Sequence, residues 1–322
     1  MTRRLGTALR LLIGIGAMVW LIAGIDAGEA WNTLQRASAA WLVVAMLAQI
    51  GSKACWLYRW KELLNSVGQS RPTGELAKLV LLGLFFNNFL PSSVGGDVAR
   101  GIGLAGLGVP KATAAASVLA DRMVGLFSMA IVAVLGAAAG LFLQPAQGPW
   151  LPATILALVL AAGTALFSRP AVIAALSRIP AFTAQKGLGR KVGRLLESAQ
   201  FLAEREAAMR RAIVLSLGLS VFSTIYHWAI GQATGIAVPF TAYCVLVPAV
   251  MLFSSLPITL NGLGIREVSF VGLLAAQGVP RADATVFALL AFLGTQVFSI
   301  AGGVLFLAEV RGRWSMRKRA LP

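Results

Sequence analysis

Residues 84–101 read LFFNNFLPSSVGGDVARG, which sets polar and helix-breaking residues between two strongly apolar segments. A helix that faces lipid would not tolerate this mixture, because the bilayer core offers no water to satisfy polar groups. Such backbone persists at membrane depth only where it is buried in protein or lines a wet cavity. The stretch therefore predicts a break inside a membrane protein, around which the neighbouring segments are arranged.

The composition is that of a polytopic membrane protein. Of the 322 residues, 58% are apolar and only 12% are charged, about half the roughly 25% charged share that is usual for a soluble domain. The net charge of +16 would suggest nucleic acid in a soluble protein. Here the basic residues collect in loops and tails, where an anionic inner leaflet attracts them. We therefore expect no nucleic-acid partner.

Several apolar segments are long enough to cross a bilayer, which takes roughly 17 residues or more. We expect full spans at residues 8–25, 41–58, 123–143, 151–168, 212–232 and 284–308. Two further apolar regions, within residues 79–109 and 241–277, are broken by proline and glycine, so we expect re-entrant hairpins there. The predicted fold class is all-α, a polytopic helical membrane protein with about six full spans plus two re-entrant broken-helix hairpins. The pair Asp121-Arg122 is expected to interrupt the long apolar segment 112–143.

Most of the 28 basic residues lie in the two chain ends and in the loops 59–78 and 169–211. The positive-inside rule assigns these segments to the cytoplasm. We therefore expect a multi-pass protein of the bacterial inner (cytoplasmic) membrane with both termini cytoplasmic. In this topology the first hairpin enters from the cytoplasm and the second from outside.

The two broken regions resemble each other. The sequence FLPSS at 89–93 matches SLPIT at 255–259, and GVPKA at 108–112 matches GVPRA at 278–282. A duplication within a single domain of residues 1–322, with halves at about 41–143 and 212–308, explains the match. The topology makes the copies inverted, as in transporters whose substrate site lies where broken helices meet. A chance match of two Gly-Val-Pro turns is the alternative, since proline is common at helix starts.

The first hairpin offers donors for an anion from polar side chains and from a glycine turn that exposes backbone N–H groups. Its candidate substrate-binding residues are Asn87, Asn88, Ser92, Ser93, Gly95, Gly96, Asp97 and Arg100. A half-helix that begins near Asp97 would point its partial positive charge into the membrane, which suits a phosphate or carboxylate. Asp97 is then a helix cap or a partner of Arg100 rather than a ligand for the anion.

The remaining candidates come from the long third span and the second hairpin, and are Asp121, Arg122, Asn261, Gly262, Arg266 and Glu267. A charge at the bilayer centre costs about 3 kcal/mol, so an unpaired arginine without function is not expected there. Arginine also binds phosphate bidentately. Substrate binding and structural pairing with the nearby carboxylates both stay open. Adjacent helical residues point about 100° apart, so Asp121-Arg122 and Arg266-Glu267 should pair across helices rather than with themselves.

Motifs for catalysis are absent from the sequence. No lysine is followed by serine or threonine, so there is no P-loop, and there is no G-x-S-x-G elbow. One histidine and two cysteines in apolar segments, Cys55 and Cys244, cannot build a histidine or cysteine metal site. We therefore expect no catalytic residues, no metal, no cofactor and no enzymatic activity.

The chain resembles the lysylphosphatidylglycerol synthase transmembrane family, or flippase-like domain proteins, through three motifs. These are NNFLPSSVGGDVARG at 87–101, DR at 121–122 and GLGIRE at 262–267, and the resemblance covers roughly residues 5–310. In the multiple peptide resistance factor, the similar domain moves an aminoacylated phospholipid between leaflets and is fused to a cytoplasmic aminoacyl-tRNA-dependent transferase. We expect a stand-alone member without that transferase, so synthesis of lysylphosphatidylglycerol is not implied.

The resemblance and the polar hairpins together predict translocation of an anionic or aminoacylated phospholipid, or a related lipid. An ion-coupled carrier of a small anionic solute stays open, because Asp97, Asp121 and Glu267 lie in membrane segments. A membrane protein that recruits a lipid-modifying enzyme through the basic loop 169–211 also stays open. The expected partner is a membrane phospholipid or other lipid, and a homodimer is left open.

Overall fold

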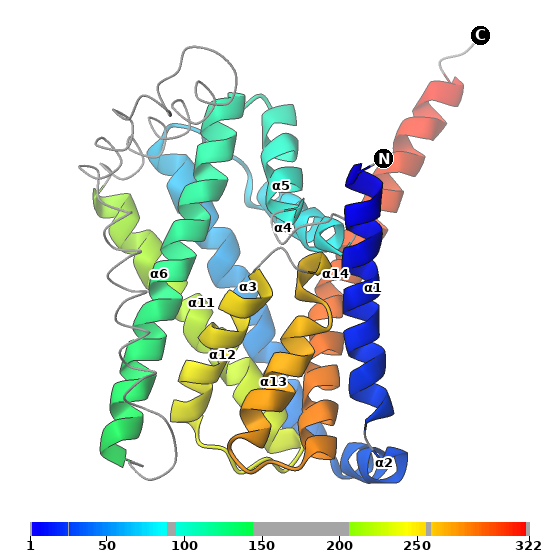
Figure 1. Cartoon of the computed structure of the whole chain (residues 1–322). Helices are drawn as coiled ribbons and strands as arrows, with labels where there is room; N and C mark the ends of the chain where they lie inside the picture. The colour runs from blue at the N-terminus through cyan, green and yellow to red at the C-terminus, as the bar shows by residue number, and fades with distance from the viewer. Residues whose placement is uncertain (1, 25, 89–94, 144–205, 256–258, 320–322) are drawn as a thin grey trace.

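The computed structural model describes residues 2–24, 26–88, 95–143, 206–255 and 259–319, which form ten α-helices and one short 3₁₀ helix (Figure 1). The helices are α1 (Thr2–Ala23), α2 (Ala27–Arg36), α3 (Ala39–Ser66), α4 (Thr73–Asn87), α5 (Gly95–Gly106), α6 (Lys111–Leu143), α11 (Glu206–Ala233), α12 (Phe240–Ser255), α13 (Ile265–Ala275) and α14 (Arg281–Arg319). The predicted all-α class is thus confirmed. The predicted span 151–168, Ser92 and Ser93 lie outside the described residues.

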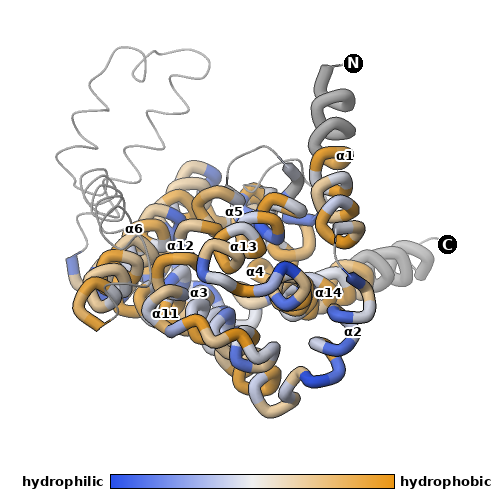
Figure 2. Tube along the Cα trace, turned by 60° about the horizontal axis from the view of Figure 1, so that its bottom comes forward, coloured by the Kyte–Doolittle hydropathy of each residue, from blue (hydrophilic) through white to orange (hydrophobic). Residues whose placement is uncertain are grey.

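Among the described helices, four are long and apolar enough to cross a membrane, namely α3, α6, α11 and the Arg281–Ala308 part of α14. A fifth candidate combines Leu11–Ala23 with α2, which is bent from it by 87°. Large apolar side chains such as Ile102 and Phe142 are 69% and 87% exposed, as expected where lipid covers them. In Figure 2, apolar residues colour most of the bundle, whereas α2 carries hydrophilic ones. The chain is an integral multi-pass membrane protein.

The predicted interruption of the third span is wrong, because α6 runs unbroken for 33 residues through Asp121-Arg122. At 1.5 Å per residue it is about 50 Å long, which exceeds a bilayer core of about 30 Å and requires tilt or protrusion. The two charged residues do not break the helix because both are paired with oppositely charged residues of neighbouring helices.

The second span also differs from the prediction, since α3 continues past residue 58 to Ser66. Trp60 and Arg59 lie in the part of the chain that was predicted as the loop 59–78, but they are 0% and 4% exposed. Trp60 packs in a buried apolar cluster with Leu64, Leu76 and Leu104. This part of α3 therefore belongs to the protein interior, and hydrophobicity alone could not reveal that.

Four short helices form two antiparallel pairs in opposite halves of the bundle. We call the end at which α1 begins and α14 ends the upper end, and the opposite end the lower end (Figure 1). Helices α4 and α5 pack together in the upper half, and α12 and α13 pack together in the lower half. None exceeds 16 residues, or about 24 Å. Each pair thus has the form of the predicted hairpin, while the duplication itself stays a hypothesis.

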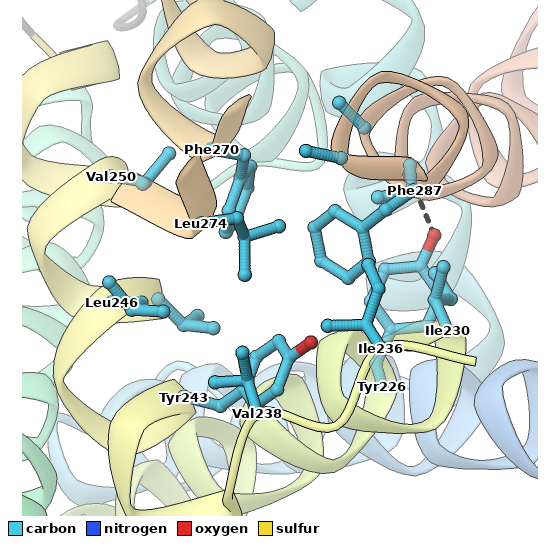
Figure 3. Close-up of a cluster of buried hydrophobic side chains, with 14 of the residues drawn as sticks. Tyr226, Ile230, Ile236, Val238, Tyr243, Leu246, Val250, Phe270, Leu274 and Phe287 are labelled. Atoms are coloured by element: carbon cyan, nitrogen blue, oxygen red, sulfur yellow. Dashed lines mark hydrogen bonds between the residues drawn. The ribbon is translucent and has the colours of Figure 1, made fainter. Parts of the chain in front are cut away.

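The main apolar core lies in the lower half, where α11, α12, α13 and α14 meet (Figure 3). Tyr226, Phe270 and Phe287 are at most 2% exposed, and the ring centroids of the two phenylalanines lie 5.4 Å apart. The hydroxyl of Tyr226 donates a hydrogen bond of 2.7 Å to the carbonyl oxygen of Ala291, so the buried phenol is satisfied. This core holds the second hairpin against α11 and α14.

Helices α4 and α5 approach closely at a pair of glycines. A Cβ atom at Gly96 would collide with the carbonyl oxygen of Gly83 and with the side chain of Asn87. The Asn87 Oδ1 atom accepts a hydrogen bond of 2.5 Å from the backbone N–H of Gly96. Asn87 and Gly96 therefore fix the geometry of the first hairpin.

Gly96→Ala is expected to destabilise the protein by about 1–3 kcal/mol, because the added methyl group meets backbone that cannot yield without moving α4. Thermal unfolding in detergent, followed by tryptophan fluorescence, measures the effect. Gly74→Ala is the matched control, since a Cβ there meets nothing within 4 Å. Equal unfolding temperatures for the two variants would contradict the close packing.

Candidate functional site

Five charged side chains from α3, α5 and α6 form one connected group, which we call the buried ion network: Arg59, Asp97, Arg100, Asp121 and Arg122. Asp121 is at its centre. Its Oδ1 atom accepts a hydrogen bond of 2.6 Å from Arg59 Nε, and its Oδ2 atom accepts two of 3.1 Å from the terminal nitrogens of Arg100. At 1% exposure, the Asp121 carboxylate has as its partners among the described residues these two arginines and the indole N–H of Trp56 at 2.8 Å.

Arg100 is 1% exposed and lies between two tryptophan rings. Its guanidinium carbon is 4.0 Å from the ring centroid of Trp60 and 4.7 Å from that of Trp56, so cation–π contacts add to the ion pairs. Arg100 therefore performs the structural pairing that the sequence left open, and it is covered by protein.

Asp97 and Arg122 lie at the accessible edge of the network. Arg122 Nη1 donates a hydrogen bond of 2.8 Å to Asp97 Oδ2, and their side chains are 30% and 19% exposed. Asp97 is also 3.3 Å from Arg100, as the sequence suggested. Three arginines and two aspartates leave the network with one net positive charge, and Arg122 is the arginine that an outside anion can reach most readily.

A groove of about 710 Å³ runs between α5 and α6, and we call it the α5–α6 groove. Asp97 and Arg122 line it at one end and Lys111 lines it near the upper end. Its walls are mostly apolar, with Val98, Gly101, Ile102, Ala105, Val118 and Leu119 among the lining residues. Lys111 and Arg122 are eleven residues apart on one helix, or about 16 Å. The groove thus joins a cation at the upper end to a cation at membrane depth.

The tips of the two hairpins meet at a second polar group. Asn261 Nδ2 donates a hydrogen bond of 3.2 Å to Asn88 Oδ1, and Asn88 Nδ2 donates to Gln296 Oε1 at 2.8 Å and to Ser299 Oγ at 2.7 Å. Gln296 is fifteen residues into α14, about 22 Å from its lower end, and therefore near the middle of the span. Asn261 has a φ of 50°, a left-handed conformation that asparagine tolerates better than most residues.

Arg266 and Glu267 pair with each other, so the expected pairing across helices is wrong for this pair. Arg266 Nε and Nη2 lie 3.0 and 2.8 Å from Glu267 Oε1. Glu267 turns back because its Oε2 atom accepts a hydrogen bond of 2.8 Å from the N–H of Gly264, which caps the start of α13. Asp121 and Arg122, in contrast, pair across helices as predicted.

A cavity of about 230 Å³ lies beside the hairpin tips, and we call it the central cavity. It is lined by Leu11, Asn88, Asn261, Leu263, Arg266, Phe292 and Gln296. The candidate residues are thus divided between two cavities instead of sharing one groove. Asn87 and Gly96 serve the packing of α4 against α5, Gly95 is buried, and Gly262 forms the turn beside Asn261 with a φ of 73°.

Sequence reasoning missed three residues of these sites, Arg59, Lys111 and Gln296. A signal existed for Gln296, because a polar side chain in the middle of an apolar span is rarely without a partner. Arg59 fell in the predicted loop 59–78, since nothing local shows that α3 extends past residue 58. Among the residues that the structure describes, no group of three His, Cys, Asp or Glu side chains is placed to hold a metal ion.

The fold, the α5–α6 groove and the central cavity define a polytopic helical membrane protein with two pairs of short helices. Comparison with known families identifies it further. The chain belongs to the lysylphosphatidylglycerol synthase transmembrane region family, whose model matches residues 7–303. The resemblance found in the three sequence motifs is therefore confirmed.

Similar curated proteins are archaeal. A UPF0104 membrane protein of Methanothermobacter thermautotrophicus is 24% identical over 287 residues, which cover 82% of each chain. A UPF0104 membrane protein of Archaeoglobus fulgidus is 28% identical over 113 residues, 35% of this chain and 34% of that protein. A second protein of that name from Methanothermobacter thermautotrophicus is 27% identical over 162 residues, 50% of this chain and 48% of that protein.

Proposed function

We propose that this protein translocates an anionic or aminoacylated phospholipid, or a related lipid, between the leaflets of the cytoplasmic membrane, and that it does so as a transporter rather than an enzyme. The observation that carries the proposal is the α5–α6 groove, which combines apolar walls with cations at both ends. Lipid tails require the apolar walls, and an anionic headgroup requires the cations.

The dimensions of the groove match one leaflet. The separation of about 16 Å between Lys111 and Arg122 is close to half of a bilayer core of about 30 Å. Val98 and Ile102 on the groove are 50% and 69% exposed, so tails can stay in contact with them while the headgroup moves along the groove. The headgroup phosphate would pass from Lys111 to Arg122, where it would offset the net positive charge of the buried ion network.

The orientation of the protein follows from its charges as part of the same proposal. The positive-inside rule assigns the upper end to the cytoplasm, because the basic chain ends lie there. The α5–α6 groove would then receive lipid from the inner leaflet. The second hairpin, in the lower half of the bundle, would face the outer leaflet.

Gly101→Leu is expected to slow lipid translocation at least fivefold. Gly101 lines the groove, and a Cβ there meets nothing within 4 Å, so the leucine side chain narrows the groove without a backbone clash. Leucine is also a better helix former than glycine, and the fold should not suffer. The measurement uses liposomes that contain headgroup-labelled phosphatidylglycerol and a membrane-impermeant quencher, which reports how fast inner-leaflet lipid becomes accessible.

Gly272→Leu on α13 is the matched control, because a Cβ there also meets nothing within 4 Å and the residue does not line the groove. It should translocate lipid at the wild-type rate. If the wild-type protein does not exceed protein-free liposomes for any anionic or aminoacylated lipid tried, the function is refuted. If Gly101→Leu and Gly272→Leu behave alike, the assignment of the groove is refuted.

A further inference from the structure

The hydrogen bonds beside the central cavity have a fixed direction. The carbonyl oxygen of Leu84 can only accept, so the hydroxyl of Ser299, 3.2 Å away, donates to it. Ser299 must then accept from the amide nitrogen of Asn88, which also donates to Gln296 Oε1. In this arrangement Asn88 Oδ1 accepts a hydrogen bond from Asn261. Gln296 presents its Oε1 atom to Asn88, so its Nε2 amide points away from Asn88.

The direction of these bonds leaves unused donors around the central cavity. Gln296 Nε2 has no hydrogen-bond partner among the described residues, and Arg266 Nη1 has none either, because Glu267 takes only Nε and Nη2. The Nδ2 group of Asn261 carries two hydrogens and uses one for Asn88. Three side chains from α13, α14 and the turn before α13 therefore present N–H groups to one small space.

The charged side chains around this space also carry a net positive charge. Lys53 on α3 is close enough to Arg266 for the two positive charges to interact. Among the described residues Lys53 has no acidic partner, and its ammonium nitrogen lies 5.8 Å from the ring centroid of Trp56. Glu267 is a single carboxylate against the two cations Arg266 and Lys53, and its oxygens are already used by Arg266 and Gly264. A second negative charge at this depth would lower the electrostatic energy.

The volume limits what can bind. At about 230 Å³, the cavity is smaller than the roughly 300–1,000 Å³ of sites that enclose a drug-sized ligand. It has room for a phosphate group with a few attached atoms and none for acyl chains. Tetrahedral phosphate also matches donors that converge from several directions, and an arginine nitrogen among them makes those bonds charge-assisted.

We propose that the central cavity is a second binding site that takes the phosphate of a lipid headgroup near the middle of the membrane. This inference rests on the proposed function in one respect, namely that the bound phosphate belongs to a lipid. A phosphate that accepts from Gln296 and from the second hydrogen of Asn261 Nδ2 leaves the hydrogen bond between Asn261 and Asn88 in place. A phosphate in the site is therefore held by α14 and by the turn before α13 while the two hairpin tips stay in contact.

Gln296→Glu tests the site directly. The glutamate keeps an oxygen that accepts from Asn88 but replaces the unused N–H donors by a negative charge. The full-length protein in maltoside detergent is titrated calorimetrically with a short-chain phosphatidylglycerol and, in a separate arm, with inorganic phosphate. We expect Gln296→Glu to weaken binding of the lipid at least tenfold. Gln296→Met, which is neutral and of similar size, is the matched control and should weaken it less.

Asn261→Asp is a second variant should Gln296→Glu fail to fold, because aspartate shares the tolerance of asparagine for the left-handed conformation. It also adds a negative charge beside Arg266 and should weaken binding at least tenfold. Asn261→Gly keeps the backbone conformation without the charge and is its control.

Four outcomes decide the proposal. Lipid binding that both negatively charged variants weaken supports it. Wild-type protein that binds neither probe, or charged variants that bind as the wild type does, overturns it. Inorganic phosphate that binds as tightly as the lipid overturns the lipid as the source. If Arg122→Gln weakens binding while the two charged variants bind as the wild type does, the phosphate binds in the α5–α6 groove and not in the central cavity. The translocation rate of Gly101→Leu is a separate result, so failure of this site and failure of the proposed function are distinguishable.

Discussion

Asp121→Asn is expected to destabilise the protein by about 3–5 kcal/mol, since it removes the charge that compensates two buried arginines. Arg59 and Arg100 are 4% and 1% exposed, and both donate to the Asp121 carboxylate. The asparagine side chain has nearly the same shape, so the loss reports charge and not a cavity. Thermal unfolding in detergent, together with the fraction that survives size-exclusion chromatography after heating, measures it.

Glu62→Gln provides the matched control for this loss. Glu62 accepts a hydrogen bond of 2.7 Å from Arg211, but these side chains are 28% and 61% exposed. An ion pair of this exposure contributes about 0–1 kcal/mol. The two substitutions remove the same charge, and only burial differs between them. Similar unfolding temperatures for Asp121→Asn and Glu62→Gln would show that Asp121 does not hold the buried ion network together.

Arg122→Gln is expected to reduce lipid translocation at least tenfold while lowering stability much less than Asp121→Asn. The Arg122 side chain is 30% exposed, and its partner Asp97 keeps Arg100 at 3.3 Å. The deep end of the groove loses its cation, so a headgroup phosphate has no charge to bind there. Arg122→Lys keeps the charge without the planar fork and should fall between glutamine and the wild type. The liposome quenching assay, normalised to folded protein, measures the three rates.

Arg36→Gln is the control for a general loss of positive charge. Arg36 ends α2 at the lower end of the molecule and is exposed, far along the bundle from the α5–α6 groove (Figure 1). Its translocation rate should equal that of the wild type. If Arg122→Gln translocates lipid at the wild-type rate, or if Arg36→Gln lowers the rate as much as Arg122→Gln does, then the headgroup does not bind at Arg122 during translocation.

The sequence predicts the helical fold and the break at residues 84–101 because both depend on local composition. Apolar segments of sufficient length must be helical in lipid, and proline and glycine favour the end of a helix, although α12 continues through Pro248. Neighbouring residues also sufficed to place Asp97 beside Arg100, three positions away on the same helix. Among the described residues of the hairpins, Arg100 is buried, and Asn88 and Asn261 hydrogen-bond within the protein.

The composition of the two cavities depends on contacts between distant segments, which local patterns do not contain. Asn88 and Asn261 are 173 positions apart, and Arg59 and Asp121 are 62 apart. Their meeting depends on the rotation of each helix about its own axis, which a nearly uniform apolar sequence does not specify. The pairing of Arg266 with Glu267 was mispredicted for a related reason, since the cap formed by Glu267 on Gly264 overrides the usual helical direction of the side chain.

The distribution of ion pairs differs between the two hairpins. The ion pair of Arg100 with Asp121 connects α5 to α6, and the ion pair of Arg59 with Asp121 connects α3 to α6. Arg59 also donates a hydrogen bond of 2.8 Å to the hydroxyl of Ser216 on α11. The pair Arg266–Glu267 lies within α13, and among the described residues no salt bridge joins α13 to another helix. Displacing α5 would separate buried charges, whereas displacing α13 would separate none. The first hairpin is therefore held to its neighbours by charge, whereas the second is held by the apolar core in which Phe270 and Leu274 pack.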